Sequence, residues 1–204
     1  MTTTTNPLRF RIDGARASFP VLFKGEQFQG EGSFRCGVSL IVPPDHKQFA
    51  QIKAALIEAA KAKWKDKAAE TYKAAAKKDK LAFRDGDDKA KYDGYAGNWI
   101  LSANCPGGAT EAECTKPTVY DGQRNLITDP AKNPIYSGCY VNAVVEFYAD
   151  SRFGDGVFCK LVGIQFAKDG DAFGSAPAKA DDFEPVTAGA DADDFGDPAD
   201  TPWA

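Results

Sequence analysis

The sequence has few of the residues on which most enzyme active sites depend. It contains one histidine, His46, and no GxxxxGK[ST], GxSxG or HExxH motif. A single histidine gives little support to a histidine-containing catalytic dyad or to a typical zinc site. Three acids share a glycine-containing stretch and could hold a divalent cation, but such clusters more commonly form the turn itself: Asp85, Asp87 and Asp88. We therefore expect no catalytic residues, no metal and no cofactor.

Long apolar runs and paired cysteines are also missing. No run reaches the ~20 residues of a membrane-spanning helix, and the first six residues do not resemble a signal peptide. The five cysteines include no CxxC pair. Three of them (Cys36, Cys139 and Cys159) fall in strand-like runs, where a reduced cysteine behaves as a small core hydrophobe. Cys105 and Cys114 lie in a glycine-rich loop and could pair or bind metal. The pattern favours a reducing compartment and no membrane contact.

Acidic residues are concentrated in residues 169–204. This segment holds ten acids and one base, Lys179, among Gly, Ala, Pro, Ser and Thr. Such a composition buries too little apolar surface to offset the entropy of ordering, which predicts a disordered acidic tail. The tail carries 1 − 10 = −9, so residues 1–168 carry 24 − 19 = +5, although the whole chain is at −4. A basic body with an acidic arm is typical of proteins that bind polyanions.

The tail also presents single aromatic residues between its acids. Asp181-Asp182-Phe183 recurs as Asp193-Asp194-Phe195, and the sequence closes on Trp203-Ala204. Isolated aromatics on an anionic segment resemble short linear motifs, which insert an apolar anchor while their acids meet a basic rim. We predict that Phe183, Phe195 and Trp203 contact partner proteins. The alternative is that the tail only improves solubility.

Short amphipathic runs dominate the body. They predict strands at residues 8–23, 34–42, 98–104, 118–120, 138–149 and 157–168. Gly14 interrupts the first run and indicates a bulge, after which Phe19 is expected on the same face as Ala15 and Ala17. In residues 138–149, one face is expected to carry Val141, Ala143, Val145 and Phe147.

One lysine-rich helix interrupts these strands. Asp45 is predicted as its N-cap with Gln48 in the capping-box position, and the helical spacing continues to about Lys78. The lysines form either a solvated face or a phosphate-contacting one. A closed barrel buries several short strands without leaving edges, and the OB-fold combines five strands, an inserted helix and a single-strand-binding face. We predict a mainly β protein: an antiparallel five-stranded OB-fold barrel in residues 1–168, then the tail in 169–204.

Binding of single strands without sequence preference needs cations along a groove and aromatic faces on which bases stack. The body offers both types of side chain in its turns and on polar strand faces. Trp99 is predicted as the best stacking residue, supported by Tyr92 and Tyr95, although a core position is an equally good explanation for any one aromatic. The predicted DNA contacts are Arg9, Arg11, Arg16, Lys24, Arg35, Arg84, Lys89, Lys91, Tyr92, Tyr95, Trp99, Tyr120, Arg124, Tyr140, Tyr148 and Phe153.

Five short motifs stand in a fixed order along the chain: Ala17-Ser18-Phe19-Pro20, Arg84-Asp85-Gly86-Asp87, Ile100-Leu101-Ser102-Ala103-Asn104, Tyr136-Ser137-Gly138-Cys139-Tyr140-Val141-Asn142-Ala143 and Lys168-Asp169-Gly170-Asp171. Their order resembles a family of single-stranded DNA-binding proteins of tailed phages, long described only as a domain of unknown function. The resemblance extends from about Leu8 to Phe183, and the Tyr136–Tyr140 stretch is its most specific part.

The resemblance implies an OB-fold protein that coats single-stranded DNA during phage replication or recombination, in the cytoplasm of the infected bacterial host. It also implies that the tail recruits phage or host replication proteins, although the tail differs from similar ones in ending on Trp203-Ala204 rather than on phenylalanine. Two alternatives stay open: a recombination mediator or annealing protein, and an adaptor that binds only proteins. A homodimer is a further open alternative.

Overall fold

The computed structural model describes residues 8–28, 30–152 and 154–174. Phe153 and the tail aromatics Phe183, Phe195 and Trp203 lie outside the described residues. The described part ends at Gly174, beyond residue 168, where the sequence predicts the boundary between barrel and tail. The described residues therefore cover almost the whole predicted barrel and the first residues of the predicted tail.

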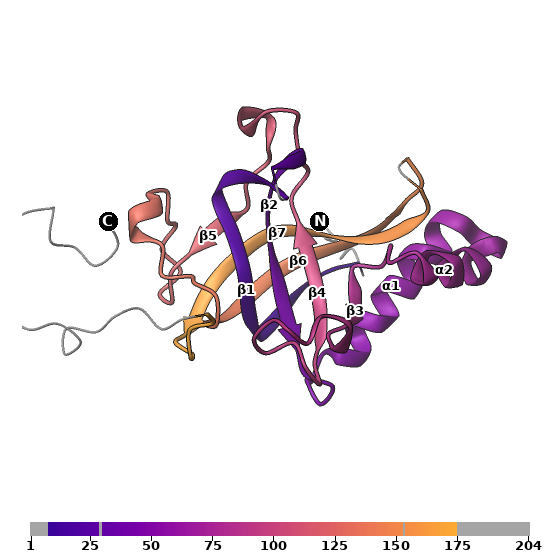
Figure 1. Ribbon diagram of the computed structural model, residues 1–204, viewed down its shortest axis with the longest axis horizontal. Coiled ribbons are helices and arrows are strands. Elements are labelled where there is room, and N and C mark those ends of the chain that lie inside the picture. Colours follow the sequence, from indigo (N-terminus) through magenta and orange to yellow (C-terminus); the bar gives the residue numbers. More distant parts are fainter. Residues whose placement is uncertain (1–7, 29, 153, 175–204) are drawn as a thin grey trace, which may run out of the picture. The chain divides into compact units, whose positions relative to one another are not determined.

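Strands that are distant in sequence close into a barrel (Figure 1). The ring consists of β1 (Arg9–Phe28), β2 (Glu31–Val42), β4 (Trp99–Asn104), β7 (Gly156–Lys168) and β6 (Tyr140–Asp150). All pairs around it are antiparallel except β4–β7, where Ala103 and Asn104 lie beside Cys159 and Lys160 in parallel. This closure confirms the predicted OB-fold barrel, with one parallel pair in place of a fully antiparallel ring.

Two short strands extend the sheet beyond the ring. β3 (Phe83–Asp85) pairs with β4, and β5 (Thr118–Tyr120) runs parallel to β7. The sequence predicted β5 with these bounds but no strand at the position of β3. Three residues with one buried side chain, Phe83, give too short a pattern for alternation to be recognised.

Strand β1 is bent twice. Gly14 adopts φ +65° where the pairing with β6 shifts between Ile12 and Ala15, which confirms the predicted bulge. A second shift, between Ser18 and Val21 in the pairing with β2, has Phe19 at φ +49°. This irregularity turns Phe19 outward, where it is 55% exposed. The expectation that Phe19 shares the core face of Ala15 and Ala17 was wrong, because a bulge resets the alternation.

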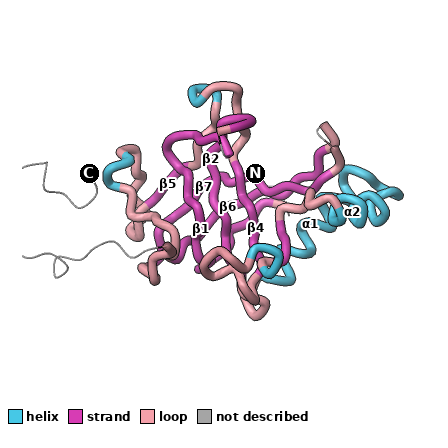
Figure 2. The backbone as a smooth tube through the Cα atoms, viewed as in Figure 1, coloured by secondary structure: helices cyan, strands magenta, loops and turns pink. Residues whose placement is uncertain are grey.

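The core fills the barrel and continues under the helical segment. Val141, Ala143, Val145 and Phe147 are all buried, as the alternation of β6 predicted. Helices α1 (Phe49–Trp64) and α2 (Ala68–Lys77) lie together beyond one end of the barrel (Figure 2). They are separated by a 3-10 turn at Lys65–Lys67. No helix in the described part of the chain is long and apolar enough to cross a membrane.

The start of α1 differs from the prediction. The helix begins at Phe49, so Asp45 lies too far upstream to be its N-cap. The Gln48 side chain instead accepts a hydrogen bond from Asp13 N (2.9 Å) and donates one to Arg11 O (2.6 Å). The amide that the capping box assigned to the helix therefore joins the helix start to the bulge of β1.

All five cysteines are free and buried, in agreement with reduced core hydrophobes. Cys114 Sγ lies 3.8 Å from Cys36 Sγ, so the loop cysteine contacts a strand cysteine rather than Cys105. Burial raises the pKa of both the Cys36 and the Cys105 thiol to about 12. In the described residues no group of three or more His, Cys, Asp or Glu side chains is arranged to hold a metal ion.

Candidate nucleic-acid interface

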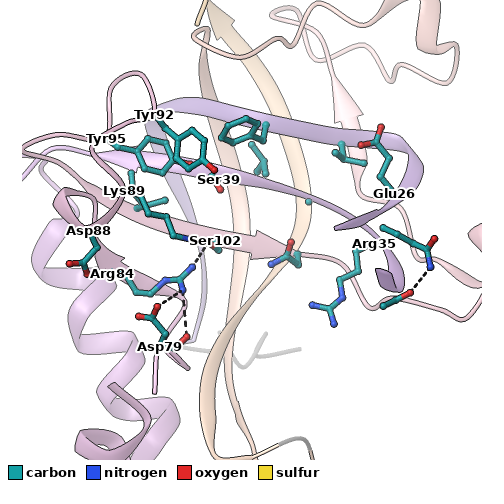
Figure 3. Close-up of a pocket in the computed structure, with 18 of the residues that line it drawn as sticks. Glu26, Arg35, Ser39, Asp79, Arg84, Asp88, Lys89, Tyr92, Tyr95 and Ser102 are labelled. Atoms are coloured by element: carbon teal, nitrogen blue, oxygen red, sulfur yellow. Dashed lines mark hydrogen bonds and ion pairs between the residues drawn. The ribbon is translucent and has the colours of Figure 1, made fainter. Parts of the chain in front are cut away.

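An open groove of about 730 Å³ lies on the outer face of β2 and β4, between β1 and the loop formed by residues 86–98. Its floor is made by the side chains that alternate with core residues, including Ser39, Ser102 and Asn104. Gly37 completes the floor, since a Cβ at this position would collide with the Asn104 side chain. Figure 3 shows the groove with Tyr92 and Tyr95 on one side and Arg35 across the floor.

Three aromatic rings form one wall of this groove. Phe19 meets Tyr92 edge to face with centroids 5.3 Å apart, and Tyr92 meets Tyr95 at 5.4 Å. Phe19 and Tyr92 are exposed, whereas Tyr95 is only 4% exposed and supports Tyr92 from below. The sequence predicted Tyr92 and Tyr95 but missed Phe19, for which the only signal was its place in the Ala17–Pro20 motif.

Hydrogen bonds donated by backbone amides close the 86–98 loop on itself. Gly86 N donates to Asn98 O (2.8 Å), and Asp87 Oδ1 accepts from Gly97 N (2.6 Å). Asp85 Oδ1 accepts from Asp87 N (3.0 Å). A side chain at position 86 would collide with the carbonyl oxygens of Tyr95 and Asn98. The acidic cluster therefore builds the turn that carries Tyr92 and Tyr95.

Cations are present in the groove but do not dominate it. Arg35, Arg84 and Lys89 line it. Arg84 is partly engaged, with Nη1 3.9 Å from Asp79 Oδ2 and Nη2 3.4 Å from Ser102 Oγ (Figure 3). Arg35 and Lys89 have no carboxylate within 4.0 Å in the described residues.

Carboxylates outnumber these three cations in the lining: Glu26, Glu31, Asp79, Asp85 and Asp88. The balance of 3 − 5 = −2 shows that the groove is not an evenly positive channel. A polyanion would bind here through stacking and a few well-placed cations rather than through overall charge.

Two further predicted residues, Lys91 and Tyr148, do not line the groove. Lys91 borders an adjacent depression of about 270 Å³ that shares Phe19 and Tyr92 with the groove. Tyr148 is 41% exposed and packs on Phe158 with centroids 5.8 Å apart. Burial and the Asp150 charge raise the pKa of Tyr148, and the charges of Arg152 and, less strongly, Arg35 act against that shift.

Trp99 lies away from the groove. It packs against Phe83 and Phe49, with centroids 5.1 and 5.6 Å away, and Lys53 Nζ lies 4.1 Å from its ring centroid. Its neighbour Ile100 lines the groove instead. Alternation along β4 therefore places Trp99 on the inner side, beneath α1, so the geometry gives it a core role rather than the stacking role we expected.

The other predicted DNA contacts are spread over the body. Arg9 and Arg11 begin β1, and Arg11 pairs with Asp13; Lys24 Nζ lies 3.7 Å from Glu111. Tyr120 ends β5, and Arg124 lies in the turn that follows, at φ +70°. Arg16 and Tyr140 contact each other and residues at the end of the body. Five of the sixteen predicted residues therefore meet in the groove: Arg35, Arg84, Lys89, Tyr92 and Tyr95.

Comparison with known proteins agrees with the fold. The family profile described as "Enterobacter phage Enc34, ssDNA-binding protein" matches residues 9–196. The chain belongs to this family. Putative protein p50 of Acyrthosiphon pisum secondary endosymbiont phage 1 is 35% identical over 184 residues, which cover 88% of this chain and 95% of that protein. The predicted resemblance is thereby confirmed.

Two solved structures have the same fold. The single-stranded DNA-binding protein from bacteriophage Enc34, solved in complex with ssDNA, matches with a TM-score of 0.64 at 21% identity, over 82% of this chain and 90% of that chain. Gp2.5, a single-stranded DNA-binding protein encoded by bacteriophage T7, matches with a TM-score of 0.52 at 16% identity, over 87% and 98%. The family and these neighbours are DNA-binding proteins rather than enzymes, in line with the expected lack of catalytic residues.

Proposed function

We propose that this protein binds single-stranded DNA without sequence preference, in the groove between β1, β2, β4 and the 86–98 loop. The observation that carries the proposal is the exposed Phe19–Tyr92 pair standing beside a floor with Arg35, Arg84 and Lys89. Unpaired bases can stack on such rings, while the cations contact phosphates. The small polar side chains of the floor leave room for a strand to lie across it.

Membership in a phage family supports a role in coating single strands during phage replication or recombination, in the cytoplasm of the host cell. Most of the tail, residues 175–204, lies outside the described residues, and the sequence of this part carries one base against eight acids, or −7. We propose that it competes with DNA for the body and presents Phe183, Phe195 and Trp203 to phage or host replication proteins. Its covalent attachment at Gly174 keeps its acids at a high local concentration near the body.

The test compares two oligonucleotides of equal length, one unstructured and one folded into a hairpin duplex. Fluorescence anisotropy at low salt should show clearly tighter binding to the unstructured oligonucleotide, because stacking platforms reach bases only when these are unpaired. Equal affinity for both would contradict the proposal. Binding to neither, with binding to a replication protein retained, would favour the protein-only adaptor.

A further inference from the structure

The last described residues, 169–174, pack on the motif Tyr136–Tyr140. We call residues 169–174 the C-terminal strap. Tyr136 Oη lies 2.9 Å from Gly170 O and 3.0 Å from Asp169 Oδ1, and it accepts a hydrogen bond from Gly170 N (3.2 Å). Gly138, at φ +107°, lets the strap approach closely, because a Cβ here would collide with Asp171 O. The glycine of this motif is thus explained by the strap that crosses it.

Arg16 fixes the middle of the strap. Its Nε donates to Gly138 O (2.9 Å) and its Nη2 to Asp171 O (2.7 Å). The guanidinium carbon lies 4.4 Å from the centroid of the Phe173 ring, in cation–π geometry. Arg16 was predicted to contact DNA, but these two donors are directed at Gly138 and at the strap.

Phe173 joins the strap to the groove. Its side chain packs in a small cluster with Ile41, Tyr95 and Ile100, separate from the main core. Gly94 lies so close that a Cβ there would stand 2.9 Å from Phe173 Cζ. Gly174 N then donates to Asp93 Oδ2 (2.7 Å). The strap therefore contacts the 86–98 loop at two points: Phe173 packs against Tyr95, and Gly174 N donates to Asp93.

Ser137 connects the strap to Phe19, the exposed aromatic residue at the start of the groove wall. Its carbonyl oxygen accepts from Phe173 N (3.0 Å), and its Oγ accepts from Phe19 N (3.0 Å). One residue thus holds Phe19 in its exposed conformation and Phe173 beneath the loop. We infer that the C-terminal strap positions the stacking wall of the groove, with Phe173 as the positioning residue that holds the Tyr92–Tyr95 loop against β2 and β4.

The inferred effect on DNA affinity rests on the proposed function, but the contact between the strap and the 86–98 loop can be tested separately. It predicts that a chain shortened to residue 168 loses part of its DNA affinity, whereas a chain shortened to Gly174 does not. A loop held in place only part of the time lowers the apparent affinity by the fraction of time it is competent. Removing residues 169–204 together would therefore combine two opposite effects on DNA affinity. Loss of the strap would lower the affinity, and loss of the tail acids would raise it.

The experiment uses the full chain with Phe173→Ala, and with Phe10→Ala as the matched control. Phe10 is also half-buried, but it stacks on Phe147 and packs against the main core. Amide hydrogen exchange is measured in the free proteins and anisotropy with an unstructured oligonucleotide. Phe173→Ala should raise exchange in residues 86–98 by about tenfold or more while β6 and β7 keep the parent's protection. The affinity should fall by about two- to tenfold, the range expected for one lost aromatic contact.

Phe10→Ala should leave both the exchange of residues 86–98 and the affinity close to those of the parent protein. Phe173→Leu, which keeps an apolar side chain, should lie between parent and Phe173→Ala, and it replaces that variant if Phe173→Ala exposes the whole body to exchange. Unchanged exchange in 86–98 would overturn the inference. So would increased exchange with undiminished affinity. A parent that binds no single strand would instead refute the proposed function, and the exchange pattern would still decide whether the strap holds the loop.

Discussion

Arg35 stands on the groove floor opposite the aromatic wall, without a carboxylate partner in the described residues. It is therefore free to contact a phosphate, whereas Arg84 is partly engaged by Asp79. Each phosphate contact contributes about 0.7 to the slope of log affinity against log salt for a single strand. The three lining cations predict a slope of about −2, shallower than that of a uniformly basic channel.

Arg35→Ala should weaken binding and reduce that slope by about 0.7, because one phosphate contact is lost. The measurement is a series of oligonucleotide titrations at increasing salt concentration. Arg124→Ala is the control, since it removes the same charge from an exposed turn that does not line the groove. If both variants changed the slope equally, net charge rather than the groove would determine binding.

The buried thiols give a prediction on pH. Burial raises the pKa of Cys36 and Cys105 from 9.0 to about 12, so both stay protonated at pH 8 and should react slowly with thiol reagents until the protein is denatured. Because the pKa is raised in the folded state, this contribution to stability is complete below pH 9 and is lost as the pH rises toward 12. Thermal unfolding in steps from pH 7 to 11 should show a falling Tm above pH 9. A flat profile would show that the thiols are accessible to water.

The conformation of the 86–98 loop depends on Gly86. Gly86→Ala would force the Cβ against the carbonyl oxygens of Tyr95 and Asn98 and displace the loop that carries Tyr92. The loop lies outside the main core, so we expect a small loss of Tm with a larger loss of DNA affinity. Melting and titration of the same preparation measure the two effects.

Gly97→Ala is a control for Gly86→Ala, because it lies in the same loop with no atom within 4 Å of a Cβ, although its φ of +72° adds strain. Gly86→Ala should weaken binding more than Gly97→Ala does. Equal effects would mean that backbone strain, rather than the packing of the loop, controls the groove.

How far the sequence predicts each element depends on where the determining contacts lie. Strand β6 was predicted closely because alternation alone decides its buried face, from Val141 to Phe147. The outward turn of Phe19 was not, because it follows from a bulge in the pairing with β2 and from the distant Ser137. The capping role assigned to Asp45 failed for the same reason, since Gln48 is held by β1.

For the candidate site too, local patterns were predictable and distant contacts were not. Residue types singled out five side chains that the fold brings together in one groove, because cations and tyrosines in polar segments are rarely all core residues. Their contact with DNA stays a prediction. Trp99 was misplaced, since whether a strand residue faces inward depends on register with Val42 and on the cover provided by α1. Arg16 was assigned to DNA because nothing local in the sequence shows that its donors meet residues 138 and 171.

We propose that the acidic residues after Gly174 compete with DNA for the body. Residues 1–174 carry 24 − 21 = +3, and residues 175–204 carry −7. Removing residues 175–204 should strengthen single-strand binding at low salt and change it little near 1 M salt, where the Debye length falls to about 3 Å. Titrations of the full and shortened chains at both salt concentrations measure this. No gain at low salt would leave the tail only a role in partner recruitment.

We propose that single-stranded DNA lies in the groove against Phe19 and Tyr92. Photo-cross-linking tests it most directly: an oligonucleotide with bromodeoxyuridine in place of thymidine is irradiated in complex with the full chain, and the modified residues are identified by mass spectrometry. We expect adducts on Phe19 or Tyr92, which disappear when Tyr92→Ala and Phe19→Ala are combined, while Tyr120 and Trp99 stay unmodified. Adducts concentrated on Tyr120 or Trp99, with none in the groove, would contradict it.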